Sequence, residues 1–190
     1  MIYLISGLVV FFGTHLFTSL RSREPGKDIR ARIGFGPYMG LYSIASLIGF
    51  GLIVYGYGAA RPSEVIYQAP VWGRHANLAL MLVSLILLVA SQLPAGWIKK
   101  TAKHPMLLAV KVWAFGHLLA NGELISLMLF VSFLAYAVFA RIMAKRRGDT
   151  GYAGPVSIGA DIMSIVIGVA VYLGFVVWLH EILIGVPVIA

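Results

Sequence analysis

Six long apolar stretches occupy nearly the whole of this chain and constrain its fold more than any other feature. Mean hydropathy is +0.91, 60% of the 190 residues are hydrophobic and only 12% are charged. A soluble domain of this size has too little interior to bury so much apolar surface. In lipid every backbone amide needs a partner within the chain, and runs of this length provide one as helices. The sequence therefore predicts an all-α, polytopic transmembrane helical bundle.

Turn residues and charged residues mark the ends of the predicted spans. The six ranges are Ile2–Leu20, Tyr38–Gly58, Ala76–Leu93, Pro105–Ala120, Glu123–Ala140 and Asp161–Val186. The fourth is short for a hydrocarbon core of about 30 Å at about 1.5 Å per residue, so we expect local thinning or burial there. Asn121-Gly122 joins it to the fifth, and this αL-tolerant dipeptide favours a sharp reversal. If the fourth and fifth stretches instead form a re-entrant pair, the number of spans falls by one. No repeat or soluble segment interrupts the pattern, so residues 1–190 are expected to form a single domain.

The basic residues alternate between the two ends of the predicted helices. Most of the 15 lysines and arginines follow the first, third and fifth spans, whereas Arg61 and Arg74 lie at the other end and Lys111 lies inside the fourth span. By the positive-inside rule, the basic loops face the cytoplasm and both termini lie outside. Topology and lipid headgroups thus account for the net charge of +8, and we expect membrane lipid rather than nucleic acid as its partner. The absence of cysteine excludes disulfides and thiolate ligands.

Two histidines lie inside predicted spans, where an unpaired imidazole is costly. His15 lies in the first span and His117 near the outer end of the fourth. Helical spacing places Trp113 and Asn121 on the same face as His117. Each histidine is either a hydrogen-bonded core residue or a group that binds a metal or haem iron or carries protons. The face formed by Trp113, His117 and Asn121 suits either a cofactor wall or an interfacial aromatic belt.

The start of the fourth span holds a second group of polar residues. His104 precedes Pro105, and this pair is either a simple helix start or part of a site. Lys111 follows two turns deeper, on roughly the same face, where an ammonium group favours an anionic partner such as a propionate or phosphate. His75 is interpreted as an interfacial flank in the outer loop, and His180, near the outer end of the last span, either shares an outer pocket with His117 or caps a helix end.

Three stretches of the chain resemble the NnrU family of bacterial membrane proteins. They are Thr14–Arg21 (THLFTSLR), Arg32–Tyr42 and Lys103–Glu123 (KHPMLLAVKVWAFGHLLANGE). The last is the most specific, because its lysine, tryptophan and histidine stand at fixed offsets in an apolar helix. The resemblance implies a multi-pass protein of the bacterial inner (cytoplasmic) membrane, linked to denitrification through nitrite and nitric oxide reduction.

This family is also similar to the plant 15-cis-zeta-carotene isomerase, which binds haem b through histidine. His15, Lys103-His104-Pro105 and Trp113-Ala114-x-x-His117 match its pattern, although Ala114 stands where that pattern has a cysteine. The resemblance implies haem b as cofactor, with His15 and His117 as metal ligands. The expected cofactor site also contains Lys111, Trp113, His104 and Asn121. Lys111 or the basic rim would pair with the propionates.

Several alternatives remain open from the sequence. Straight, centred helices would offset His15 and His117 by about 12 Å along the membrane normal, so either tilt brings both to one haem, or one ligates while the other contacts substrate. The chain is a redox or haem-handling protein, an isomerase acting on an apolar small molecule, a lipid-modifying methyltransferase, or an assembly or regulatory factor for a membrane respiratory complex. The stretch RIMAKRRGDTGY lacks the glutamate pair that membrane methyltransferases of the isoprenylcysteine type place there, which disfavours the third.

Overall fold

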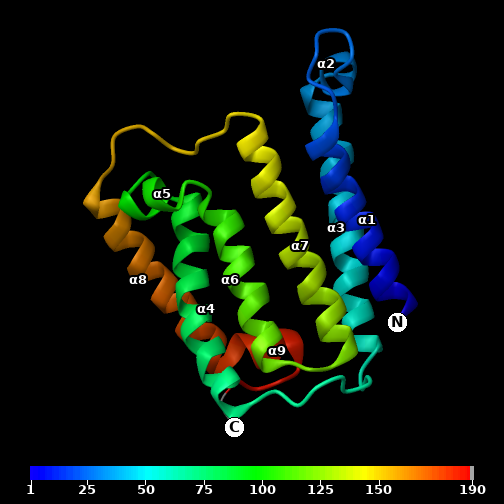
Figure 1. The fold of residues 1–190 in the computed structure, drawn as a ribbon, viewed down its shortest axis with the longest axis vertical. Coiled ribbons are helices and arrows are strands. Elements are labelled where there is room, and N and C mark those ends of the chain that lie inside the picture. The colour runs from blue at the N-terminus through cyan, green and yellow to red at the C-terminus, as the bar shows by residue number, and fades with distance from the viewer. Residues whose placement is uncertain (189–190) are drawn as a thin grey trace. The chain divides into compact units, whose positions relative to one another are not determined.

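The computed structural model describes residues 1–188, which form two helical units. Figure 1 shows the first unit in blue and cyan and the second in green to red. The first unit, Met1–Glu64, contains α1 (Ile2–Leu20), α2 (Ile29–Ile33) and α3 (Phe35–Ala59). The second begins at Val65 and contains α4 (Val71–Gln92), α5 (Trp97–Ala102), α6 (Pro105–Ala120), α7 (Leu124–Arg146), α8 (Ile158–Gly174), the π-helical turn η1 (Phe175–Leu179) and α9 (His180–Ile184).

The helix content confirms the all-α membrane architecture. Five helices are long and apolar enough to cross a bilayer, the fifth being the continuous run Ile158–Ile184, and α6 is a shorter apolar helix. The bounds of α1 and α6 coincide with the predicted spans.

Four predicted spans differ from the observed helices at their ends. α3 begins three residues before Tyr38 and α4 five residues before Ala76, while α7 continues six residues beyond Ala140. The last helix begins at Ile158 and ends at Ile184, where Gly185 takes a left-handed conformation with φ 77°. Hydropathy marks only the part of a helix that lies in hydrocarbon, whereas backbone hydrogen bonding continues through polar residues at the interface. His75 consequently lies inside the first turns of α4, not in a loop.

The predicted reversal between α6 and α7 exists, and it is made without a left-handed residue at Asn121 or Gly122. Asn121 is extended, with φ −133° and ψ 110°, and Gly122 is not among the positive-φ glycines of the described residues. Gly122 is required for a different reason: a Cβ there would overlap the carbonyl group of Tyr67. The backbone N–H of Ile66 donates to the Gly122 carbonyl at 2.8 Å, so the segment before α4 covers this turn.

Glycine allows α1 and α3 to pack with their backbones in contact. The two helices lie side by side within the first unit (Figure 1). A Cβ built on Gly7 would lie 2.6 Å from the backbone nitrogen of Ile53, and one built on Gly49 would lie 2.6 Å from that of Phe11. Because lipid tails are as apolar as leucine, close backbone approach through small residues is a principal source of attraction between membrane helices.

The second unit is a layer of helices in which α4 packs against both α6 and α8, and α6 packs against α7. Buried Ser84 of α4 donates to the carbonyl oxygen of Ala109 in α6 at 2.9 Å, which fixes the register of this pair. Asp161, in the first turn of α8, accepts hydrogen bonds from the backbone nitrogens of Trp97 at 2.7 Å and Ile98 at 2.9 Å. Its carboxylate therefore caps the N-terminus of α5.

Candidate functional site

His15 is held in α1 by its own helix and by aromatic rings. Its Nδ1 lies 2.7 Å from the carbonyl oxygen of Phe11, one turn earlier. A carbonyl only accepts, so Nδ1 carries the proton and donates, which leaves the lone pair on Nε2. The imidazole lies over the Phe11 ring, with centroids 4.2 Å apart, and beside Tyr42 of α3 at 5.2 Å.

His117 of α6 repeats this arrangement in the second unit. Its Nδ1 donates to the Trp113 carbonyl at 2.9 Å, which again places the lone pair on Nε2. The imidazole stacks on Phe130 of α7 with centroids 4.6 Å apart and planes inclined by 26°, and the Trp113 ring lies 5.3 Å away. Trp113 also contacts Phe130 and Phe133 edge-on, at 4.9 and 5.4 Å. The predicted pairing of Trp113 with His117 on one helix face therefore exists, enclosed by aromatic rings of α7.

Asn121 supports His117 through the backbone. Both its side-chain Nδ2 and its backbone N–H donate to the His117 carbonyl oxygen, each at 2.9 Å, so the amide closes the end of α6. The hydroxyl of Tyr67 donates to the Leu118 carbonyl and lies 3.2 Å from that of Asn121. These bonds satisfy terminal carbonyls that the helix leaves unpaired, so Asn121 positions the helix end that carries His117.

His104 joins the start of α6 to the loop after α7. It is the N-cap residue and Pro105 is the first helical residue, which confirms the helix-start interpretation of the pair. Its Nε2 also lies 3.3 Å from the Asp149 backbone carbonyl and 3.7 Å from a carboxylate oxygen of the same residue. The geometry gives His104 a role in loop attachment, at the opposite end of α6 from His117.

Lys111 has a cation as its charged neighbour. It interacts electrostatically with Arg141 of α7, and no ion pair to Lys111 occurs within residues 1–188. The Nη1 atom of Arg141 is buried without a hydrogen-bond partner in the same part of the chain. The predicted anionic partner of Lys111 is therefore not one of the described carboxylates, and an anionic ligand stays a prediction.

The candidate residues are divided between the two units. His15 lies in the first, whereas His104, Lys111, Trp113, His117 and Asn121 all lie on α6 or at its ends in the second. His75 is exposed in α4, and His180 begins α9, where its Nδ1 donates to the Val186 carbonyl at 2.7 Å. Among the described residues, no set of three or more His, Asp or Glu side chains forms a metal site. Haem iron takes its equatorial nitrogens from the porphyrin and needs only axial ligands from the protein.

Sequence reasoning missed the aromatic residues that pack against the two imidazoles. Phe11 stands four residues before His15, the same offset as Trp113 from His117, so helical spacing alone would have identified it. Tyr42, Phe130 and Phe133 come from neighbouring helices, and no local pattern indicates them.

Comparison with known proteins gives one family. Searches of curated proteins and of solved structures give no match. The family model described as NnrU protein matches residues 3–188, nearly the whole chain and both helical units. With five apolar helices of membrane-spanning length and a shorter sixth, the chain is a membrane protein that belongs to the NnrU family.

Proposed function

We propose that this chain binds haem b in the membrane, and that its candidate iron ligands are His15 in the first unit and His117 in the second. The observation that carries the proposal is the hydrogen bond from each Nδ1 to the carbonyl of the residue four positions earlier. Histidines that ligate metals almost always donate their other ring N–H to a carbonyl or carboxylate, which fixes the tautomer and orients Nε2. Both imidazoles therefore leave the Nε2 lone pair available, as a histidine that held the haem iron would.

The surroundings of both rings also suit a large, flat, apolar group. Phe11 and Tyr42 pack beside His15, and Trp113 and Phe130 beside His117. Lys111 and Arg141 supply two cations without described carboxylate partners, which would pair with propionates. Haem bound here would supply one-electron chemistry, and His15 and His117 would hold its iron while the surrounding aromatic rings would exclude water.

Membership of the NnrU family supports a place in respiratory nitrogen-oxide metabolism. We propose redox chemistry or haem handling that assists nitrite and nitric oxide reduction in the bacterial inner membrane. Ala114, fully buried where the similar isomerase pattern has a cysteine, gives this chain no thiol for ligand exchange. The proposal therefore takes haem binding from the resemblance to the isomerase, and it does not include a step in which a cysteine thiol exchanges as ligand.

The test is the absorption spectrum of the purified protein and of two alanine variants. The wild type should show a Soret band, and His15→Ala and His117→Ala should each lower the haem-to-protein ratio or convert a six-coordinate spectrum to a five-coordinate one. His75→Ala, an exposed histidine of α4, is the matched control and should keep the wild-type spectrum. Added imidazole should restore the lost coordination in the affected variants. A protein that takes up no haem, or two ligand variants with unchanged spectra, would refute the proposal.

A further inference from the structure

An apolar pocket lies at the end of the first unit where α2 meets α1 and α3. Its volume is about 310 Å³, at the lower end of the range for small-molecule sites. Phe17 of α1, Leu41 of α3, and Ile29 and Ile33 of α2 contribute its apolar walls. These four side chains remain between 37% and 65% exposed, so the described chain leaves the pocket open.

The polar groups that line the pocket are already paired. The hydroxyl of Thr14 donates to the Val10 carbonyl at 2.8 Å, and the hydroxyls of Thr18 and Tyr38 bond to each other at 2.8 Å. An occupant therefore meets hydrocarbon, not open donors and acceptors. This favours an alkyl chain over a polar small molecule.

The rim of the pocket carries excess positive charge. Between Arg21 and Arg32 the chain has five basic and two acidic residues. Arg21 pairs with Asp28, where their side chains are 7% and 17% exposed, and Lys27 pairs with Glu24 at 2.8 Å. Both carboxylates are thus neutralised, and the remaining guanidinium groups belong to Arg23, Arg30 and Arg32.

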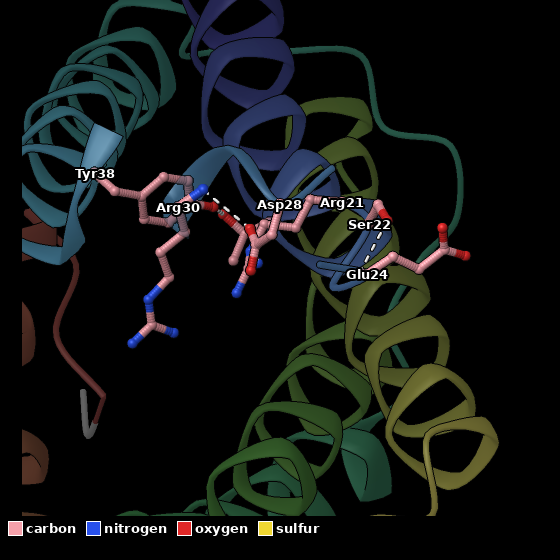
Figure 2. A network of polar contacts seen from close by, with 7 residues as sticks. Arg21, Ser22, Glu24, Asp28, Arg30 and Tyr38 are labelled. Atoms are coloured by element: carbon pink, nitrogen blue, oxygen red, sulfur yellow. Dashed lines mark hydrogen bonds and ion pairs between the residues drawn. The ribbon is translucent and has the colours of Figure 1, made fainter. Parts of the chain in front are cut away.

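The fold of α2 directs two of these arginines to the flanks of its apolar face. Asp28 caps the helix by accepting from the backbone N–H of Arg30 at 2.9 Å. Figure 2 shows this bond and shows the guanidinium of Arg30 pointing away from Asp28. Ile29 and Ile33 are one turn apart and both line the pocket, while Arg30 and Arg32 lie between them in sequence and so on either side of that face. A short helix with an apolar face and basic flanks suits the membrane–water interface.

We propose that this pocket binds one anionic phospholipid, with an acyl chain between α1, α2 and α3 and the phosphate group at Arg30 and Arg32. The basic loops are the predicted cytoplasmic side, where anionic headgroups attract arginines close to the membrane surface. The pocket adjoins the His15 region, because Tyr42 both lines it and packs beside the imidazole. The bound lipid would hold α2 against the two membrane helices at that end of α1.

Native mass spectrometry of the full chain tests the site, after reconstitution with phosphatidylglycerol or phosphatidylcholine of the same acyl chains. One phosphatidylglycerol per chain should be retained in preference to phosphatidylcholine. Arg30→Gln and Arg32→Gln should each reduce that preference about fivefold, as expected for one basic residue near the membrane surface. Leu41→Trp, which fills the pocket, should reduce retention with both arginines intact. The control is the double variant Lys145→Gln/Arg146→Gln, which removes two exposed charges from the end of α7. It should leave the preference for phosphatidylglycerol unchanged.

Three results with lipid would overturn the proposal, and a fourth concerns a second copy of the protein. They are equal retention of the two lipids, an equal loss of preference in the α7 control, and displacement of the lipid by glycerol phosphate, which has the headgroup chemistry without the chain. Retention of a second copy of the protein in place of lipid would also contradict it. The side chain of Arg32 is exposed and has no ion pair or hydrogen bond within residues 1–188, so Arg32→Gln tests the charge without disturbing the fold. The proposed haem binding is tested by the absorption spectrum and the proposed lipid binding by mass spectrometry, so either proposal can fail without deciding the other.

Discussion

Gly49→Ala is expected to separate α1 from α3 and disturb His15 at the same time. The added methyl carbon would lie 2.6 Å from the backbone nitrogen of Phe11 and 2.9 Å from its Cα, whereas ordinary contact begins at 3.4 Å. The obstacle is backbone, which cannot rotate away as a side chain can. The helices must therefore move apart by several tenths of an ångström or more.

The magnitude follows from comparison with Gly51→Ala on the same helix. Among the described residues, no atom outside the surrounding turns of its own helix lies within 4 Å of the Cβ position at Gly51, so that variant changes helix propensity without a clash. Because propensity favours alanine equally in both variants, it cancels in the difference. Overpacking of a well-packed contact costs about 1–3 kcal/mol. Gly49→Ala should thus have a folded-to-unfolded ratio roughly 5- to 150-fold below that of Gly51→Ala.

Reversible unfolding in mixed micelles with SDS measures this difference. The chain has no cysteine, so one introduced cysteine in each helix can carry a donor or an acceptor dye that reports the separation of α1 and α3. Since Phe11 supplies the carbonyl that holds His15, Gly49→Ala should also lower the haem-to-protein ratio while Gly51→Ala leaves it unchanged. Equal unfolding midpoints for the two variants would refute the backbone contact on which this reasoning rests.

Three further outcomes are expected. Reporter fusions in the loop after α7 should read cytoplasmic and fusions between α3 and α4 external, and the reverse pattern would show that the charge asymmetry does not set the topology. The hydrogen bond from Arg21 lowers the pKa of Asp28, so this pairing stabilises α2 above the ordinary carboxyl range and the stabilisation is lost as pH falls through the depressed pKa. A fluorophore on Ala31→Cys should report release of α2 at acid pH, and Asp28→Asn should remove the transition. Lys111→Met should accumulate normally, because it relieves repulsion with Arg141, but should lose bound haem; unchanged haem content would mean that Lys111 does not meet the ligand.

The sequence predicted the five helices of membrane-spanning length and the shorter apolar α6, because bilayer thickness imposes a length on apolar runs. It predicted α1 and α6 to the residue, since a charged loop follows the first and a proline begins the second. Helix ends that continue through polar residues, such as α7 beyond Ala140, were missed because hydropathy does not record them. The short helices α2 and α5 were missed as well, because their apolar residues are too few to stand out from a basic loop.

The candidate site was predictable only where its residues share a helix. Trp113, His117 and Asn121 follow from a spacing of four residues, and the structure places all three in contact along α6. Contacts between helices depend on which faces pack, and glycine contacts such as Gly49 against Phe11 decide that without a hydropathy signal.

The hydrogen bonds of His15 and His117 favour the proposed ligand role over a proton-carrying one. In an α-helix, the carbonyl of the residue four positions earlier already accepts a hydrogen bond from the backbone N–H of the histidine. The carbonyls of Phe11 and Trp113 therefore each accept two hydrogen bonds, one from that N–H and one from Nδ1 of the imidazole. A group that shuttles protons gains from changing its hydrogen-bond partners, whereas this bond holds one tautomer and one ring orientation. Phe11 and Trp113 cover the same rings and limit their rotation. An imidazole held in this way, with its lone pair on Nε2, is suited to coordinate iron.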